Sequence, residues 1–240
     1  MRSWALLIVL ATQPALADVQ VLDSGSQRVH LVELFTSEGC SSCPPADRWL
    51  REHLDDPALW RDVVPVAFHV DYWDYLGWRD PFARPEHSAR QRSYAGQGLA
   101  SGVYTPGFFV DGEEWRGFFR RQQLNPAPAS APRLVSTIDQ DQVHISLSAR
   151  GLAQPTAHVA ILGFGLQTQV PRGENRGRRL SHDFVVLGLE TTRLTVSDGD
   201  YQGTLDLPIS RRPTQRQAVA VWVSDGTQAP LQAVGGWLNR

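Results

Sequence analysis

The sequence predicts an α/β domain followed by a small all-β sandwich-like domain, and three observations lead to this fold class. Up to residue 124, apolar strands alternate with polar or amphipathic helices, as in α/β domains. Residues 125–132 (NPAPASAP) are rich in proline and lack hydrophobic periodicity, which is typical of an extended linker. From residue 133 onward, short strands recur between turn residues, which favours a sandwich. We therefore expect domains at 18–124 and 133–240.

The elements of each domain follow from local patterns. An apolar run at 29–36 predicts a buried strand, and Pro44 and Pro45 fit the first turn of a helix at 44–54, where a missing N–H costs little. The rest of the first domain is a strand at 63–70, an aromatic segment at 71–78, a polar helix at about 86–95, and a loop, strand and Asp-Gly turn within 103–112. Strands of the second domain are predicted at 142–148, 157–164, 181–189, 201–207, 217–224 and 230–235.

Residues 1–17 have the pattern of a cleaved export signal. Arg2 supplies a positive start, an apolar stretch follows, and Ala15-Leu16-Ala17 fits a signal-peptidase site. The apolar stretch is too short to span a bilayer, so a retained anchor is the weaker alternative. We expect a secreted or periplasmic protein with no stable membrane span after cleavage.

The charge balance excludes one class of partner. The 240-residue chain carries a formal net charge of −2 at pH 7. Nucleic-acid binding needs a net basic face, so we expect no nucleic-acid partner. No sequence feature indicates an oligomeric state.

Cys40 and Cys43 are the only cysteines, and they form a single Cys-Ser-Ser-Cys motif where a strand hands over to a helix. A helix N-terminus favours an anion and lowers the pKa of a thiol placed there. The pair therefore indicates redox chemistry in an oxidising compartment. A structural disulfide and a metal half-site are the alternatives. A disulfide that closes so short a loop would add little stability, and a metal site would need two more ligands. Pro44 stands where a haem-attachment motif requires histidine, and we expect no cofactor and no bound metal.

Three further segments sharpen this interpretation. The stretch 35–47 (FTSEGCSSCPPAD), the stretch 69–74 (HVDYWD), and Tyr104-Thr105-Pro106 ahead of Val110-Asp111-Gly112 resemble a secreted thioredoxin-like family known as domain of unknown function 1223. The segments 173–178 (GENRGR) and 182–186 (HDFVV) are similar to the same family, so the resemblance covers most of the chain. It implies a thioredoxin-like fold with a β appendage, and no substrate.

The candidate site residues follow from the motif and the resemblance. Cys40, which is N-terminal in the pair, is the expected nucleophile, and Cys43 is the expected resolving thiol. The resemblance implies that Pro106 is cis and that the backbone at Tyr104 and Thr105 binds the substrate chain. An ordinary trans proline is the alternative, since few X-Pro bonds are cis.

Glu33 is a further candidate, because a carboxylate in an apolar strand is costly to bury without a role or a partner. By analogy with thioredoxins it would exchange protons with Cys43, and an ion pair with an arginine is the alternative. Trp73, within the aromatic segment, would line a substrate groove or join a satellite core. His69 would be a proton shuttle, a metal ligand, or simply a buried histidine with satisfied hydrogen bonds. The Arg-rich turn at 173–179 would bind an anion, dock on the first domain, or lie in solvent.

These residues together predict an exported thiol–disulfide oxidoreductase that acts on protein or peptide thiols and disulfides. Two other classes stay open. A copper or other metal-binding chaperone would use both cysteines and a distant histidine such as His69. A non-enzymatic binding module would not need Cys40 at all.

Overall fold

The computed structural model describes residues 19–127, 130–210 and 212–239, so the predicted signal at 1–17 lies outside the described residues. The helices are α1 Pro44–Arg51 and α2 Pro85–Gly96, with 3-10 turns η1 Glu52–Asp55, η2 Asp74–Leu76 and η3 Gly117–Arg120. The strands are β1 Gln20–Asp23, β2 His30–Thr36, β3 Val63–His69, β4 Gly107–Val110, β5 Glu113–Glu114, β6 Arg133–Asp139, β7 Gln142–Ser148, β8 Pro155–Phe164, β9 Leu166–Gln169, β10 Arg179–His182, β11 Val185–Arg193, β12 Thr195–Ser197, β13 Asp200–Asp206, β14 Arg216–Asp225 and β15 Pro230–Trp237.

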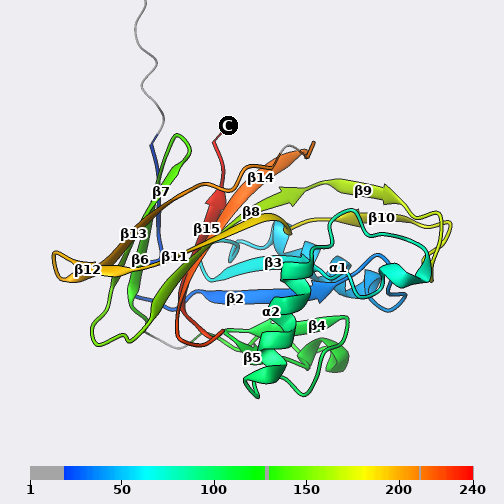
Figure 1. The fold of residues 1–240 in the computed structure, drawn as a ribbon, viewed down its shortest axis with the longest axis horizontal. Helices are drawn as coiled ribbons and strands as arrows, with labels where there is room; N and C mark the ends of the chain where they lie inside the picture. The colour runs from blue at the N-terminus through cyan, green and yellow to red at the C-terminus, as the bar shows by residue number, and fades with distance from the viewer. Residues whose placement is uncertain (1–18, 128–129, 211, 240) are drawn as a thin grey trace, which may run out of the picture.

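One large sheet runs through most of the molecule (Figure 1). Its eight strands lie in the order β15-β14-β8-β11-β3-β2-β4-β5. The central strand β3 is parallel to both of its neighbours, β2 and β11, while the other pairs are antiparallel. Strands from the two ends of the chain thus belong to the same sheet.

The predicted fold class is wrong. The described residues are 43% strand and 14% helix, and their large multi-strand sheets do not make an α/β thioredoxin-like domain followed by a small all-β one. The physical reason lies in strand pairing. β8, β11, β14 and β15, expected in a separate sandwich, extend the sheet of β2 and β3, and a local pattern identifies a strand without naming its neighbour.

The remaining strands form two smaller sheets. β1 pairs with β6, and the order β1-β6-β7-β13-β12 makes a five-stranded antiparallel sheet at one end of the molecule (Figure 1). β9 and β10 form a two-stranded ribbon near α1 at the other end. The boundary predicted at 125–132 falls between η3 and β6, and the division into domains stays a prediction.

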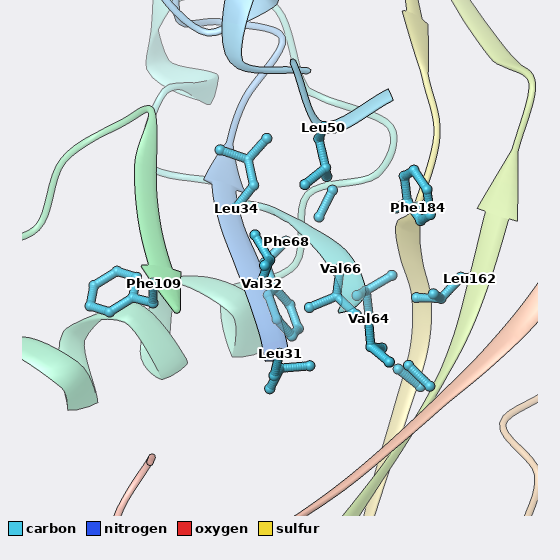
Figure 2. Packing of buried hydrophobic residues seen from close by; sticks show 14 of the residues in the cluster. Leu31, Val32, Leu34, Leu50, Val64, Val66, Phe68, Phe109, Leu162 and Phe184 are labelled. Atoms are coloured by element: carbon cyan, nitrogen blue, oxygen red, sulfur yellow. The ribbon is translucent and has the colours of Figure 1, made fainter. Parts of the chain in front are cut away.

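Two large apolar clusters and a smaller third one hold these layers together. The larger one lies between the helices and the eight-stranded sheet, and its side chains come from both halves of the chain. Figure 2 shows Leu34 of β2 and Val66 of β3 in the same cluster as Leu162 of β8 and Phe184. The second cluster fills the space between the eight-stranded and the five-stranded sheets, with Leu134 and Leu147 facing Val219 and Val221. Burial of these side chains is the main stabilising contribution.

Most of the predicted helices and strands are present in the structure at about the predicted residues. α1 begins at Pro44 as expected, and the last part of its predicted range continues as η1. The buried face of α2 is mostly polar and consists of His87, Ser88, Arg90, Gln91 and Tyr94. The predicted strand at 181–189 is split, because β10 ends at His182 and β11 begins at Val185.

Candidate functional site

The two cysteines are joined by a disulfide at the start of α1. Their Cα atoms are 5.5 Å apart, and Cys43 occupies the N-cap position directly before Pro44. No side chain among the described residues caps this end of the helix. Pro44 and Pro45 carry no N–H, and the N–H groups of Ala46 and Asp47 donate to the Cys43 carbonyl at 2.8 and 3.1 Å. The helix dipole is therefore what favours a thiolate here once the disulfide is reduced.

Both sulfur-bearing side chains are covered in the oxidised form. Cys40 is 1% exposed and Cys43 is fully buried, while Ser41 and Ser42 between them are exposed. Exposure therefore does not distinguish the two cysteines in this state, and the assignment of Cys40 as nucleophile stays a prediction.

The Arg-rich turn covers the cysteine loop. Asn175, which is fully buried, donates through Nδ2 to the carbonyl oxygens of Glu38 at 2.8 Å and Cys40 at 2.9 Å. The Ser41 N–H donates to Glu174 at 2.9 Å, and Arg178 holds the Asn175 amide oxygen at 2.8 Å. Hydrogen bonds from Ser41 lower the pKa of Glu174. Of the three expected arrangements, the structure shows this turn docked on the cysteine loop.

A buried ionisable cluster lies next to the cysteine loop. Glu38 accepts hydrogen bonds from Trp78 Nε1 at 2.7 Å and His182 Nε2 at 3.0 Å. Asp80 accepts from the Glu38 N–H at 2.8 Å and from His69 Nδ1 at 2.7 Å. Each of the four ionisable residues is no more than 2% exposed. We call Glu38, His69, Asp80 and His182 the His–carboxylate cluster.

Within this cluster, the charges of His69 and Asp80 stabilise each other. Burial opposes ionisation of His69, but the charge and hydrogen bond of Asp80 outweigh it and raise the pKa of His69. The same pairing outweighs burial at Asp80 and lowers the pKa of that carboxyl. A charged pair in the protein interior is thereby stabilised next to the disulfide.

Two polar atoms of the cluster are unsatisfied. His69 Nε2 and His182 Nδ1 are buried without a hydrogen-bond partner among the described residues. The two rings meet edge to face at 4.8 Å, and His182 Nδ1 lies 3.9 Å from a carboxylate oxygen of Asp47. Burial raises the pKa of Asp47, against the opposing charges of His182 and His69. Unpaired buried imidazole atoms of this kind can accept or donate a proton.

Trp73 and Thr105 meet at the cysteine loop. The Trp73 indole N–H donates to Thr105 Oγ1 at 2.8 Å, and the Thr105–Pro106 peptide is cis. Gly39 packs so closely on Trp73 that an added Cβ would lie 2.7 Å from the Trp73 Cβ. The structure thus gathers Trp73 and Thr105 beside the residue before Cys40.

Tyr104 and the other aromatic side chains have structural contacts. The Tyr104 hydroxyl donates to Glu114, burial and this carboxylate raise the pKa of Tyr104 to about 12, and its carbonyl accepts from Gln91. Phe82 and Tyr94 are buried, while Tyr75 is exposed. Substrate binding by Tyr104, Thr105 and Trp73 stays a prediction.

Glu33 lies in a different buried cluster. Its carboxylate accepts from Arg90 Nε at 2.6 Å and from the Tyr94 hydroxyl, and Arg90 also bonds Gln228. An arginine partner was the alternative to proton exchange with Cys43. These contacts already use both carboxylate oxygens of Glu33.

Comparison with known proteins shows the family of the chain. The family model described as Protein of unknown function (DUF1223) matches residues 31–224, which include the cysteines, Asp80 and His182. The chain belongs to this family. The DUF1223 match begins in β2 and ends in β14, so it includes strands from both sides of the eight-stranded sheet.

Two solved structures resemble this DUF1223 protein over most of its length. One is the crystal structure of protein AGR_C_4864 from Agrobacterium tumefaciens, 30% identical, covering 89% of this chain and 96% of that one with a TM-score of 0.58. The other is HBP35 of Porphyromonas gingivalis, 15% identical, covering 90% of this chain and 77% of that one with a TM-score of 0.59. The second likeness concerns the fold alone. No curated protein matches the chain.

Glu38, Asp80, His182 and Asn175 were not identified as site residues from the sequence of this DUF1223 protein. Glu38 stands two positions before Cys40, and His182-Asp183 lies in a segment that resembles the family, so the sequence could have pointed to both Glu38 and His182. Asn175 also lies in a segment that resembles the family, within the Arg-rich turn. Asp80 carried no such signal, because only the tertiary fold brings it to the cysteine loop.

No group of three or more metal-ligating side chains is arranged around one point in the part of the chain that the structure describes. His69, the distant histidine of the copper-binding alternative, has its Nδ1 bonded to Asp80. In the same described ranges, no helix has both the length and the apolar character of a membrane span.

Proposed function

We propose that this protein is an exported thiol–disulfide oxidoreductase that acts on protein or peptide cysteines through Cys40 and Cys43. The observation that carries the proposal is the Cys40–Cys43 disulfide at an uncapped helix start, beside a buried ionisable cluster. Perturbed buried acids and histidines gather at functional sites more often than elsewhere.

The reaction needs two exchange steps. A substrate thiolate attacks Sγ of Cys40, the Cys40–Cys43 bond breaks, and Cys43 leaves as a thiolate that takes up a proton. A second substrate thiolate then attacks the substrate sulfur of the mixed disulfide and releases Cys40. The substrate loses two electrons and two protons, which the protein dithiol gains. The reverse sequence, in which Cys40 attacks a substrate disulfide and Cys43 resolves it, balances in the same way.

Proton exchange with Cys43 is better assigned to Asp47 than to Glu33. Asp47 follows Cys43 by one helical turn, with its N–H bonded to the Cys43 carbonyl at 3.1 Å. Its buried carboxyl has a raised pKa and lies beside His182, so it can hold a proton nearer to neutral pH. Glu33 is already bonded to Arg90 and Tyr94, which supports a structural role for it.

Export is part of the same proposal. Residues 1–17 have a signal-peptide pattern, and a secreted or periplasmic location keeps a disulfide oxidised. The N-terminal sequence of the purified mature protein tests this point. A mature chain that still begins at Met1 in the soluble cytosolic fraction would remove export from the proposal.

The reduction potential of the Cys40–Cys43 couple is the decisive measurement. Thiol trapping in glutathione and dithiothreitol buffers should give a value of roughly −120 to −270 mV, the range of known exchange catalysts. A value below about −300 mV would indicate a disulfide that resists reduction, and a non-enzymatic binding module would then replace the enzyme.

Single cysteine variants test the two roles. Cys43→Ser should accumulate a mixed disulfide on Cys40 with a model cysteine peptide, because the resolving thiol is gone. Cys40→Ser is the matched control and should accumulate little. Equal trapping by the two variants would overturn the assignment of nucleophile and resolving thiol.

A further inference from the structure

A small cavity lies beside the disulfide, between α1 and β10. It has a volume of about 150 Å³, and Pro44, the residue after Cys43, forms part of its wall. Four arginines line it: Arg48 and Arg51 from α1, and Arg178 and Arg179 from the start of β10 and the turn before it. We call this space the arginine cavity.

Most of this positive charge is not neutralised. Arg51 pairs with Asp183 at 2.5 Å. Arg178 bonds the side-chain amide of Asn175, and Arg179 bonds that of Gln167. Arg48, Arg178 and Arg179 have no carboxylate within ion-pair distance among residues 19–127, 130–210 and 212–239. Three exposed guanidinium groups without a carboxylate partner thus surround one cavity, although the formal net charge of the chain is −2.

The other ionisable groups that face the cavity do not cancel this charge. Asp47 lines it, but this single carboxylate already accepts from Thr36 Oγ1 at 2.9 Å and lies 3.9 Å from His182 Nδ1. His182 also lines it and adds no negative charge. Arginine guanidinium groups bind carboxylates through paired, charge-assisted hydrogen bonds.

The arginine cavity is connected to the disulfide in two ways. Pro44 joins it directly to Cys43 along the chain. Arg178 donates a hydrogen bond to the side-chain oxygen of Asn175, and the Asn175 side-chain NH2 donates one to the carbonyl of Cys40. The cavity wall is therefore one residue from Cys43 along the chain and two hydrogen bonds from the Cys40 carbonyl.

We propose that the arginine cavity binds a carboxylate of the thiol substrate, so that the substrates are peptide or protein segments with acidic residues next to their cysteine. This inference rests on the proposed exchange activity and names its substrate class. Binding brings the substrate sulfur to Cys40, and the bonds that form and break are those of the two exchange steps.

Three synthetic peptides of equal length test it, with a single cysteine flanked by glutamates, glutamines or lysines. Stopped-flow rates of mixed-disulfide formation with the oxidised wild-type protein are compared at low and high salt. The acidic peptide should react roughly tenfold faster than the neutral one at low salt, with the lysine peptide slowest. High salt should remove most of the difference, because it screens exposed charges.

Variants locate the effect. Arg178→Gln combined with Arg179→Gln should abolish the preference for the acidic peptide. Arg150→Gln is the matched control, since Arg150 is exposed and follows β7 in the sequence, and β7 lies at the opposite end of the molecule from β10 (Figure 1). A preference that is kept in the double variant, or lost equally in the control, would overturn the proposed site.

An uncharged thiol separates this inference from the activity itself. Exchange with 2-mercaptoethanol but equal rates for all three peptides would overturn the substrate class and leave the activity standing. No exchange with any thiol would overturn the proposed function. The wild-type comparison needs no variant, so it decides the matter even if the double variant does not fold.

Discussion

Two buried carboxylates five positions apart, Glu33 and Glu38, are held in different ways. Glu33 in β2 is bonded to Arg90 and Tyr94, and Arg90 also stacks over aromatic rings, including that of Trp222. Glu38, just before the cysteines, is bonded instead to Trp78 and His182. An arginine stays protonated at any ordinary pH, whereas a histidine titrates near neutrality.

The difference separates a structural cluster from a responsive one. The buried polar atoms of Glu33, Arg90 and Tyr94 have partners, whereas His69 and His182 each keep an unsatisfied nitrogen. Fully satisfied networks specify and rigidify a core. A partly satisfied, titratable network beside a disulfide has the properties that proton transfer requires.

The largest effect is expected at the structural cluster. Arg90→Ala leaves the Glu33 carboxylate buried without its cation, and removing one partner of a buried pair costs about 3–5 kcal/mol. Denaturant unfolding measures the loss. Arg150→Ala, at an exposed position, should change stability by less than about 0.5 kcal/mol. Similar losses in the two variants would show that the Glu33–Arg90 pair is not structural.

A smaller, pH-dependent effect is expected at the His–carboxylate cluster. Asp80→Asn removes the charge that raises the pKa of His69, at a cost of about 1–3 kcal/mol. The raised pKa of His69 contributes stability below about pH 6.5, and this is lost as the pH rises through the folded value. The lowered pKa of Asp80 contributes stability above about pH 4, and this is lost as the pH falls through the folded value.

The stability difference between wild type and Asp80→Asn should therefore be greatest between about pH 4 and 6.5. Urea unfolding of both proteins across pH 3 to 9 measures it. The Arg90→Ala loss is the reference and should vary little above pH 6, because burial, with a smaller contribution from the Arg90 charge, lowers the pKa of the nearby His158 to about 3. A pH-independent Asp80→Asn difference would contradict the coupled pair.

Gly39→Ala tests how tightly the cysteine loop packs. The new methyl group would lie 2.7 Å from the Trp73 Cβ and 3.3 Å from its carbonyl oxygen, and overpacking of this kind costs about 1–3 kcal/mol. Displacement of the loop should also speed reduction of the disulfide by dithiothreitol. Gly96→Ala in α2, where nothing lies within 4 Å, should be neutral or slightly stabilising. Equal behaviour of the two variants would show that Trp73 does not confine the loop.

The smallest stability effect is expected for Glu174→Ala. The carboxylate is exposed, so unfolding should change by less than about 0.5 kcal/mol. Loss of its bond to the Ser41 N–H should nevertheless loosen the covering turn and speed reduction of the disulfide. Glu190→Ala, exposed on β11, is the control and should leave the reduction rate unchanged. An unchanged rate in Glu174→Ala would mean that this turn does not restrict access to the cysteines.

The sequence predicted single elements better than their arrangement. Pro44 and Pro45 marked the start of α1, and apolar runs marked β3, β7 and β14. β6 was missed although Leu134, Ser136 and Ile138 alternate inward, because the adjoining proline-rich segment obscured the pattern. The fold class was wrong because strand neighbours such as Ala67 and Val185 are more than a hundred residues apart in the sequence.

For the candidate site too, the sequence identified single residues better than their partners. The cysteines, Thr105 and Trp73 were accessible from motifs, and the structure brings Trp73 and Thr105 to the cysteine loop. The partners of Glu38 come from β10 and from the segment after β3, and no spacing rule links them. Glu33 was noticed because a charge in an apolar strand stands out, yet the Arg90 contact depends on how α2 docks.

The junction between β3 and β11 has a consequence for local opening. These strands are paired at a single position, Val185 with Ala67, and the Ala67 N–H donates to Phe184 at 2.8 Å. β2 and β3, by contrast, pair along seven positions. Phe184 fills this seam against Trp60 and Phe164, so side chains rather than backbone bonds join the two parts of the sheet. Amide hydrogen exchange should therefore be faster at Ala67 than along β2. The β3–β11 junction should be the first part of the sheet to open, and it ends at Asp183 and His182, beside the cysteine loop.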